Sequence, residues 1–250
     1  MNKVGIIDYG AGNLASVLKA VDYAGGNPKI VAQPEEILHC ERLILPGVGA
    51  AGEALARLRA NHLVAALDEK VRCHGVPFLG ICLGMQLLGD TLHEFGIHEG
   101  LGWVGGEVVH LHQLTNAPVR IPHMGWNEIK FKNSATIFSE KLQKYRYFYF
   151  AHSFSFKVSD PAIVAATVDY GVESVAAIKS ENILLNTEEK NILAPYIEQF
   201  KKTDIYKMLE LRKILRQITT DTNGILKWKD EIRNAISSGN QERYDELLNI

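Results

Sequence analysis

The sequence has few cysteines, no long hydrophobic run and no excess of charge of either sign. Its three cysteines are odd in number and form no C-x-x-C pair, which excludes a disulfide scaffold and indicates reduced thiols in a cytoplasmic protein. No apolar run approaches the ~20 residues of a membrane span, and the start of the chain lacks the apolar stretch of a signal peptide. The net charge of −2 gives no reason to expect a nucleic-acid or membrane partner.

The composition changes near residue 185. Residues 188–250 hold 22 of the charged side chains, but only two of the 21 glycines and none of the nine histidines, the last of which is His152. We therefore predict one large domain over residues 1–185 and a helical extension over residues 186–250. In the extension, apolar residues at helical spacing form stripes along several predicted helices, and no motif there carries chemistry.

Short apolar runs alternate with helical patterns in the first part of the chain. Strands are predicted at residues 4–7, 29–32, 43–45 and 76–81, with helices between them. This order predicts an α/β, flavodoxin-like fold, in which an open and mostly parallel sheet carries helices on both faces. β-rich stretches at residues 119–129, 147–156, 163–168 and 175–178 predict antiparallel additions. Ligands of such folds bind beyond the carboxyl ends of the strands, which directs attention to the turns after the third and fourth strands.

The turn after the fourth predicted strand has the pattern G-x-C-x-G, from Gly80 to Gly84. A strand precedes Cys82 and a helix follows it, as in the nucleophile elbow of hydrolases. At a helix N-terminus the partial positive charge lowers the pKa of a thiol and favours the thiolate. The alternative is a buried, inert cysteine, and that interpretation holds for Cys40 and Cys73, which lack this context.

The turn after the third predicted strand reads Pro46-Gly47-Val48-Gly49. Glycine-rich turns at strand ends can direct backbone N–H groups at a developing oxyanion, which an acyl-transfer nucleophile requires. Alone the signal is weak, because Pro-Gly is ordinary turn chemistry. It gains weight because the turn ends the strand before the one that carries Cys82.

Five motifs, in order through residues 1–183, resemble a single family. They are D-Y-G-A-G-N at 8–13, L-P-G-V-G at 45–49, G-I-C-L-G-M-Q at 80–86, P-H-M-G-W-N at 122–127 and Y-F-Y-F-A-H-S-F at 147–154. The chain resembles the glutaminase subunit of imidazole glycerol phosphate synthase, a class I glutamine amidotransferase of histidine biosynthesis.

The resemblance implies a role for each site residue. Cys82 would attack the side-chain amide of glutamine, forming a glutamyl thioester and releasing ammonia. The backbone of Val48 and Gly49 would form the oxyanion hole, while Gln86 and the backbone of Ser153 and Phe154 would hold the glutamine. Neither a cofactor nor a metal is implied.

The resemblance also implies a protein partner, a (β/α)₈-barrel cyclase subunit that receives the ammonia in a heterodimer. Asn13, Met124, Trp126 and Tyr149 would lie at the docking face. On composition alone, Trp126 and Tyr149 are equally well explained as core aromatics.

One element of the family pattern is missing. The family completes a catalytic triad with a His-Pro-Glu segment on a late strand, where the histidine acts as base and the carboxylate orients it. Here residues 185–191 read L-N-T-E-E-K-N, and no histidine follows His152. The base and the orienting acid are therefore not found. We expect His152 to pack beside the glutamine pocket, and glutaminase activity to be absent or very weak.

Two alternatives stay open. The chain could be an amidotransferase paralogue that serves another acceptor, such as an acetamidino sugar of surface polysaccharide. It could instead be a non-catalytic scaffold that supports a partner synthase. The divergence after residue 184 is explained equally by evolved loss of the triad and by a frameshift.

Overall fold

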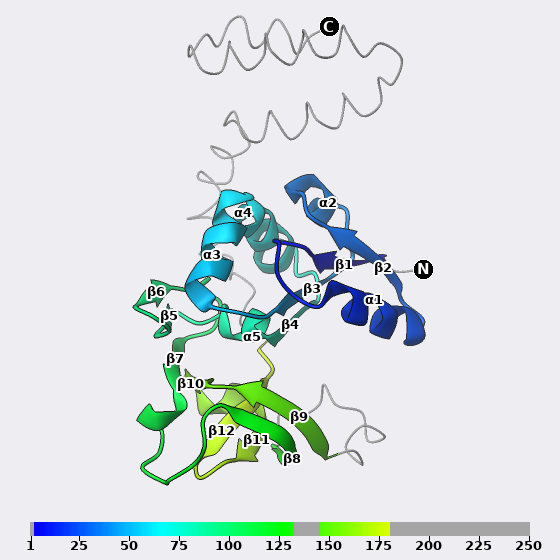
Figure 1. Cartoon of the computed structure of the whole chain (residues 1–250). Coiled ribbons are helices and arrows are strands. Elements are labelled where there is room, and N and C mark those ends of the chain that lie inside the picture. Colours follow the sequence, from blue (N-terminus) through cyan, green and yellow to red (C-terminus); the bar gives the residue numbers. More distant parts are fainter. Residues whose placement is uncertain (1–2, 133–145, 181–250) are drawn as a thin grey trace, which may run out of the picture. The chain divides into compact units, whose positions relative to one another are not determined.

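The computed structural model describes residues 3–132 and 146–180 (Figure 1). The chain divides into two compact units, Met1–Leu184 and Leu185–Ile250, of which the second lies outside the described residues. The helical extension over residues 186–250 and the domain boundary at residue 185 therefore stay predictions.

Four parallel strands form the first sheet, in the order β2-β1-β3-β4. They are β1 (Lys3–Ile7), β2 (Asn27–Val31), β3 (Arg42–Gly47) and β4 (Phe78–Cys82). The two central strands, β1 and β3, are buried almost throughout, as expected of parallel strands covered on both faces. This order is the doubly wound arrangement, and it confirms the α/β fold and all four predicted strands.

The helices that follow these strands are α1 (Leu14–Tyr23), α2 (Pro34–Leu38), α3 (Ala51–Ala60), α4 (Leu63–Leu67), a π-helical turn (Asp68–Cys73) and α5 (Leu83–Gln86). Leu55, Leu58 and Leu63 are all buried. They belong to two helices, because His62 adopts a left-handed backbone with φ of 56° between α3 and α4. In contrast, α1 buries none of its residues completely.

The later strands form two further sheets. A mixed sheet has the order β10-β7-β5-β6, with β5 (Thr91–Leu92), β6 (His98–Glu99), β7 (Gly106–His110) and β10 (Phe154–Val158). An antiparallel sheet has the order β12-β11-β8-β9, with β8 (His123–Phe131), β9 (Tyr147–His152), β11 (Val164–Asp169) and β12 (Glu173–Ile178). Two short 3₁₀ turns, Leu111–Gln113 and Pro161–Ile163, connect these strands.

The predicted antiparallel strands are thus present, with one division that the sequence did not indicate. The β-rich stretch 147–156 holds two strands, β9 and β10, which belong to different sheets. Ser153 separates them, and its carbonyl oxygen accepts a hydrogen bond from the backbone nitrogen of Leu111. Among the described residues, no helix combines the length and the apolar character that a membrane crossing requires.

Candidate active site

Cys82 occupies an unusual backbone conformation at the junction of a strand and a helix. It is the last residue of β4 and the N-cap of α5, with φ of 55° and ψ of −113°. Residues other than glycine rarely adopt positive φ, and where they do, the surrounding structure enforces it, often at a functional site. The turn therefore has the strand, the strained cysteine and the helix of a nucleophile elbow.

The glycines on either side of Cys82 are required by packing. A Cβ added to Gly84 would overlap the carbonyl oxygen of Leu45 on β3, and one added to Gly80 would lie 2.6 Å from the carbonyl oxygen of Gly84. Only residues without a side chain allow α5 to approach β3 and β4 this closely. The spacing G-x-C-x-G thus follows directly from the local geometry.

The predicted oxyanion turn lies beside Cys82. Gly47, the last residue of β3, pairs in register with Cys82, and Val48 and Gly49 follow directly. Gly49 has φ of 91°, a conformation that favours glycine, and the side chain of Val48 is exposed. The structure therefore brings the two glycine-rich turns to the same edge of the sheet.

The pKa of the Cys82 thiol is raised, contrary to the expectation from its place at a helix N-terminus. Burial of the thiol is the larger effect, and a hydrogen bond from the backbone N–H of Leu83 opposes it. Part of the residue is accessible to solvent, but protein atoms surround the sulfur closely enough to desolvate the thiolate. Because α5 has only four residues, its dipole is too small to reverse this effect.

Tyr9 is a neighbour of Cys82 that the sequence analysis did not single out. Its side chain is buried, and its hydroxyl has no hydrogen-bond partner among the residues that the structure describes. The hydroxyl oxygen would lie 3.0 Å from a Cβ added to Gly47. Burial, followed by the negative charge of the Cys82 thiolate, raises the pKa of Tyr9 to about 12. Tyr9 therefore stays protonated beside the elbow, and its place in the motif D-Y-G-x-G-N was the only signal for it.

The three residues predicted to hold glutamine come together one helical turn from Cys82. The side-chain nitrogen Nε2 of Gln86 donates to the carbonyl oxygen of Phe154 at 3.1 Å. Ser153 precedes Phe154 at the break between β9 and β10. His152 lies next to them, with its ring nitrogen Nδ1 2.8 Å from the same carbonyl oxygen.

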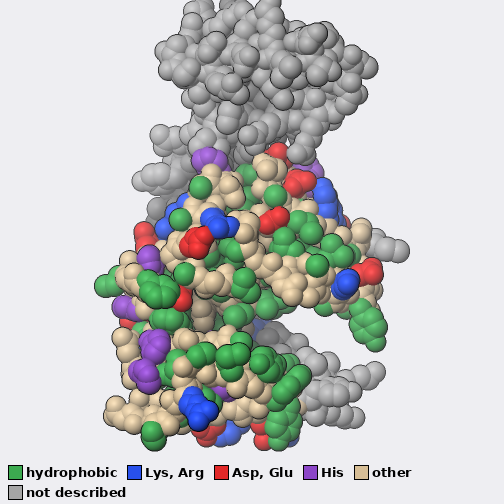
Figure 2. All heavy atoms as spheres, in the orientation of Figure 1, with side chains coloured by type: hydrophobic (Ala, Val, Ile, Leu, Met, Phe, Trp, Pro, Cys, Tyr) green, Lys and Arg blue, Asp and Glu red, His purple; other side chains and the backbone are tan. Residues whose placement is uncertain are grey.

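Three of the residues predicted at a docking face share one exposed face of β8 and β9. Trp126 pairs with Tyr149 in register, their rings meet edge to face with centroids 5.8 Å apart, and Met124 lies two residues before Trp126. Their side chains are 72%, 55% and 62% exposed, in the order Trp126, Tyr149, Met124. The alternative that Trp126 and Tyr149 are core aromatics is therefore wrong. Figure 2 shows hydrophobic side chains gathered over these two strands.

Asn13, the fourth predicted docking residue, has a structural role. It is the N-cap of α1, and its side-chain oxygen accepts a hydrogen bond from the backbone nitrogen of Ser16 at 3.2 Å. This bond satisfies one of the free N–H groups at the start of the helix. The residue is exposed, so the cap leaves it accessible.

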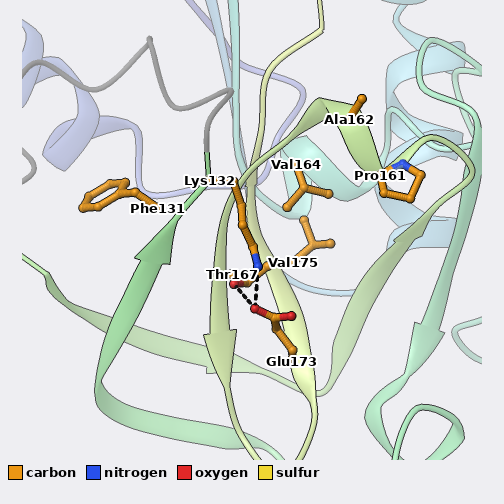
Figure 3. A pocket seen from close by; sticks show the side chains of 8 residues that line it. All are labelled: Phe131, Lys132, Pro161, Ala162, Val164, Thr167, Glu173 and Val175. Carbon is orange, nitrogen blue, oxygen red and sulfur yellow. Dashed lines mark hydrogen bonds and ion pairs between the residues drawn. The ribbon is translucent and has the colours of Figure 1, made fainter.

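A pocket of about 580 Å³ lies away from these residues, in the antiparallel sheet (Figure 3). One carboxylate oxygen of Glu173 accepts hydrogen bonds from Lys132 and Thr167, each at 2.7 Å. None of the predicted site residues lines this pocket, so it is not a candidate for the glutamine site. Within the described ranges, no group of three or more His, Cys, Asp or Glu side chains is placed to hold a metal ion.

Comparison with known proteins agrees with this geometry. The family model of class-I glutamine amidotransferases matches residues 5–185, and the chain belongs to this family. Two solved structures share the fold. A crystal structure of a glutamine amidotransferase has a TM-score of 0.50 and 17% sequence identity, and the match covers 80% of this chain and 99% of that one. The structure of PurLQS from Thermotoga maritima has a TM-score of 0.52 and 18% identity, and the match covers 77% of this chain and 90% of that one.

Curated relatives define the branch of the family more narrowly. Imidazole glycerol phosphate synthase subunit HisH of Rhodopirellula baltica is 42% identical over 179 residues, covering 72% of this chain and 85% of the relative. The protein of the same name from Zymomonas mobilis is 42% identical over 185 residues, covering 72% and 84%. Within the amidotransferases, the chain thus groups with the HisH subunits.

Proposed function

We propose that this chain is the glutamine-binding, ammonia-supplying subunit of an imidazole glycerol phosphate synthase in histidine biosynthesis. The observation that carries the proposal is the position of Cys82, held at positive φ between two glycines and in register with Gly47. The HisH names of the relatives support the pathway and glutamine as the substrate.

In the proposed reaction, the Cys82 thiolate attacks the side-chain carbonyl carbon of glutamine. Backbone N–H groups of Val48 and Gly49 stabilise the oxyanion of the tetrahedral intermediate. The carbon–nitrogen bond then breaks, and the nitrogen takes up a proton and leaves as ammonia. Water hydrolyses the remaining glutamyl thioester to glutamate and restores the thiol.

The proposed hydrolysis is slow, because the late histidine that takes the thiol proton in the family pattern is missing from the sequence. The sequence holds no histidine after His152, and a raised pKa of Cys82 keeps most of the thiol protonated at neutral pH. Among the described groups, only the Leu83 N–H lowers this pKa. Loss of a general base costs about 10²–10⁴-fold in rate.

The proposed partner is a (β/α)₈-barrel cyclase subunit, bound as a heterodimer that receives the ammonia. Met124, Trp126 and Tyr149 support this docking surface, since three large exposed apolar side chains side by side are typical of protein interfaces. Asn13 is the fourth member of the proposed surface.

The test uses the chloroketone analogue of glutamine, whose chloromethyl carbon a thiolate attacks, forming a carbon–sulfur bond and expelling chloride. Peptide mass spectrometry should find the adduct on Cys82, with a rate that saturates with reagent and slows when glutamine is added. Cys82→Ser should abolish this saturable labelling, whereas the matched variant Cys73→Ser should leave it intact. Labelling of Cys82 that neither saturates nor responds to glutamine would contradict the proposal.

The missing histidine favours a second candidate function, a non-catalytic scaffold that supports the cyclase. A scaffold tolerates loss of the nucleophile, whereas an ammonia supplier does not. Complementation of a histidine auxotroph that lacks its own HisH subunit separates the two. Growth with the wild-type chain but not with Cys82→Ala supports ammonia supply, and equal growth with both supports the scaffold.

A further inference from the structure

Two histidines outside the proposed reaction, the buried His123 and the half-buried His152, form a pair beneath the docking surface. Along β8 and β9, Met124, Trp126 and Tyr149 point to solvent, while His123, Phe150 and His152 alternate with them and point inward. His123 is 2% exposed, and its ring nitrogen Nδ1 lies 3.1 Å from Nε2 of His152.

The imidazole of His123 is held on both faces. Its ring stacks on Phe150 with centroids 4.8 Å apart and an interplanar angle of 11°, and on Tyr170 at 3.9 Å and 18°. The hydroxyl of Tyr170 in turn donates to the carbonyl oxygen of Arg120 at 2.7 Å. This stacking fixes the plane of the imidazole, and therefore the directions in which its two nitrogens point.

The direction of every hydrogen bond in the pair follows from one carbonyl group. The carbonyl oxygen of Phe154 can only accept, so Nδ1 of His152 must carry a proton. Burial lowers the pKa of His152, so the ring is neutral and Nε2 is an acceptor. Nδ1 of His123 must then donate to it.

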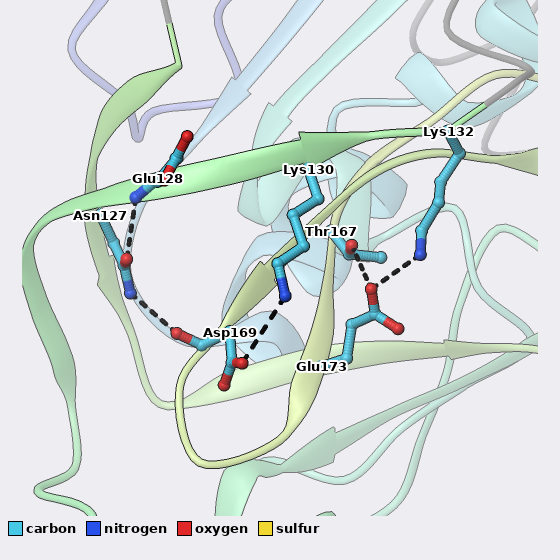
Figure 4. Close-up of polar contacts among 7 residues, drawn as sticks. All are labelled: Asn127, Glu128, Lys130, Lys132, Thr167, Asp169 and Glu173. Carbon is cyan, nitrogen blue, oxygen red and sulfur yellow. Dashed lines mark hydrogen bonds and ion pairs between the residues drawn. The ribbon is translucent and has the colours of Figure 1, made fainter.

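The same reasoning extends to the other nitrogen of His123. Burial and the neighbouring His152 lower the pKa of His123, which leaves Nε2 of the neutral ring as an acceptor. The side-chain nitrogen of Asn127 lies 3.4 Å from it and also donates to the carbonyl oxygen of Asp169 at 2.9 Å (Figure 4). The protons are therefore ordered in one direction, from Asn127 through His123 and His152 to Phe154.

The chain of hydrogen bonds ends on the Phe154 carbonyl oxygen, which is also the acceptor for the side-chain amide of Gln86. The Phe154 carbonyl oxygen has two lone pairs, and it accepts from both His152 and Gln86. Because the Gln86 nitrogen is bound to Phe154, the amide oxygen, which can only accept, is left for other donors such as N–H groups of a ligand.

We propose that His123 and His152 are positioning residues that hold the Phe154 carbonyl and, through it, the orientation of the Gln86 amide in the glutamine pocket. The inference rests on the proposed function, because it assumes that Gln86 contacts glutamine. His152 touches neither Cys82 nor its reaction in this account, so its substitution should change the binding of glutamine and leave the reactivity of the thiol unchanged.

The experiment measures the rate of Cys82 labelling by the glutamine chloroketone as a function of reagent concentration, with the full-length chain. Two variants separate the two nitrogens of His152. His152→Asn places an amide N–H near the position of Nδ1 and can keep the bond to Phe154, whereas His152→Gln reaches toward His123 and loses that bond. His152→Gln should raise the half-saturating concentration about 5- to 10-fold at an unchanged maximal rate, and His152→Asn should stay within about twofold of wild type.

Iodoacetamide, which alkylates thiols without recognising glutamine, serves as the control. Its rate at Cys82 should be the same in the wild type and in both variants. Equal shifts for His152→Asn and His152→Gln, or no shift for His152→Gln, would overturn the positioning role. Should His152→Gln not fold, His123→Phe keeps the stacked ring without its hydrogen bonds: a shift of about threefold or more supports the role, and a smaller one contradicts it.

Failure of the proposed function has a different signature. In that case the wild-type chain itself shows no saturation with the chloroketone, while iodoacetamide still labels Cys82. This result would contradict the proposed glutamine pocket, and with it the positioning role of His123 and His152.

Discussion

Gln86 and Phe154, separated by 68 residues in sequence, meet in a hydrogen bond of 3.1 Å between a side-chain amide and a backbone carbonyl. Gln86 ends the short helix that begins after Cys82, and Phe154 begins β10 of the mixed sheet. This contact joins the elbow of the parallel sheet to the strands that follow it. It places the proposed glutamine pocket at the junction of the two sheets.

The elbow should not tolerate a side chain at Gly84. We expect Gly84→Ala to lower the free energy of unfolding by about 3 kcal/mol or more, because the added Cβ would overlap the Leu45 carbonyl oxygen and force β3 and α5 apart. Urea denaturation measures the change. Gly105→Ala is the matched control, since its Cβ would meet Ser159 at an ordinary 3.6 Å, and it should change stability by less than about 1 kcal/mol. Similar losses in both variants would contradict the packing argument.

Because the Tyr9 hydroxyl is buried without a hydrogen-bond partner among the described residues, we expect the fold to tolerate its removal. Tyr9→Phe should leave the free energy of unfolding unchanged or raise it by up to about 1 kcal/mol, because a buried polar group without a partner is removed. Tyr170→Phe, which loses a hydrogen bond to Arg120, should instead cost about 0.5–1.5 kcal/mol. The same denaturation assay compares them. A larger loss for Tyr9→Phe than for Tyr170→Phe would show that the Tyr9 hydroxyl has a partner.

The pair of His123 and His152 predicts a free energy of unfolding that depends on pH. Burial lowers the pKa of both His123 and His152 from the ordinary value of 6.5, so the unfolded chain binds protons that the folded chain excludes. The contribution of the two neutral histidines to the free energy of unfolding is constant above the pKa of histidine in the unfolded chain, and it is lost as the pH falls below that pKa. The free energy of unfolding should therefore decrease between about pH 7 and pH 5, before most carboxylates titrate.

The double variant His123→Phe/His152→Asn isolates this contribution from that of the seven other histidines. Its free energy of unfolding should depend less steeply on pH than that of the wild type over the same interval. Equal slopes would show that the pair binds protons equally in the folded and unfolded chains.

The docking surface predicts a loss of affinity without a loss of stability. Trp126→Ala should weaken binding to the proposed cyclase subunit, taken from the same organism, by about 30-fold or more, as truncation of an interface tryptophan commonly does. Isothermal titration calorimetry measures the affinity, and thermal unfolding should be nearly unchanged. Tyr23→Ala, at a 95% exposed site on α1, is the matched control and should bind like the wild type. Equal affinities for all three proteins would contradict the proposed surface.

The sequence predicted those parts of the molecule that local patterns determine. The four parallel strands follow from apolar runs that end at glycine-rich turns. The elbow follows from Gly80 and Gly84, which are required where a helix packs closely against the strand before it. The strands β5, β6 and β7 were missed. In β5 and β6, two residues each carry no periodicity. The break at Ser153 was missed because residues 147–156 are β-rich on both sides of it.

Features that depend on contacts distant in sequence were beyond prediction. The pKa of Cys82 was expected to fall, because the helix N-terminus is visible in the sequence and the desolvation of the sulfur is not. The pairing of His123 with His152 depends on the register of β8 and β9. The exposure of Trp126 and Tyr149 depends on which face of those strands is turned to solvent.

The most direct test compares two quantities in one preparation, the chain mixed with the proposed cyclase partner. One is saturable, glutamine-protected labelling of Cys82 by the chloroketone, and the other is the rate of glutamate formation from glutamine. With the HisH subunit of Zymomonas mobilis as the reference, we predict labelling of Cys82 together with hydrolysis of glutamine about 10²–10⁴-fold slower. Hydrolysis at the rate of the reference would contradict the loss of the catalytic base. Some other group would then take the proton of Cys82, because the sequence has no histidine after His152.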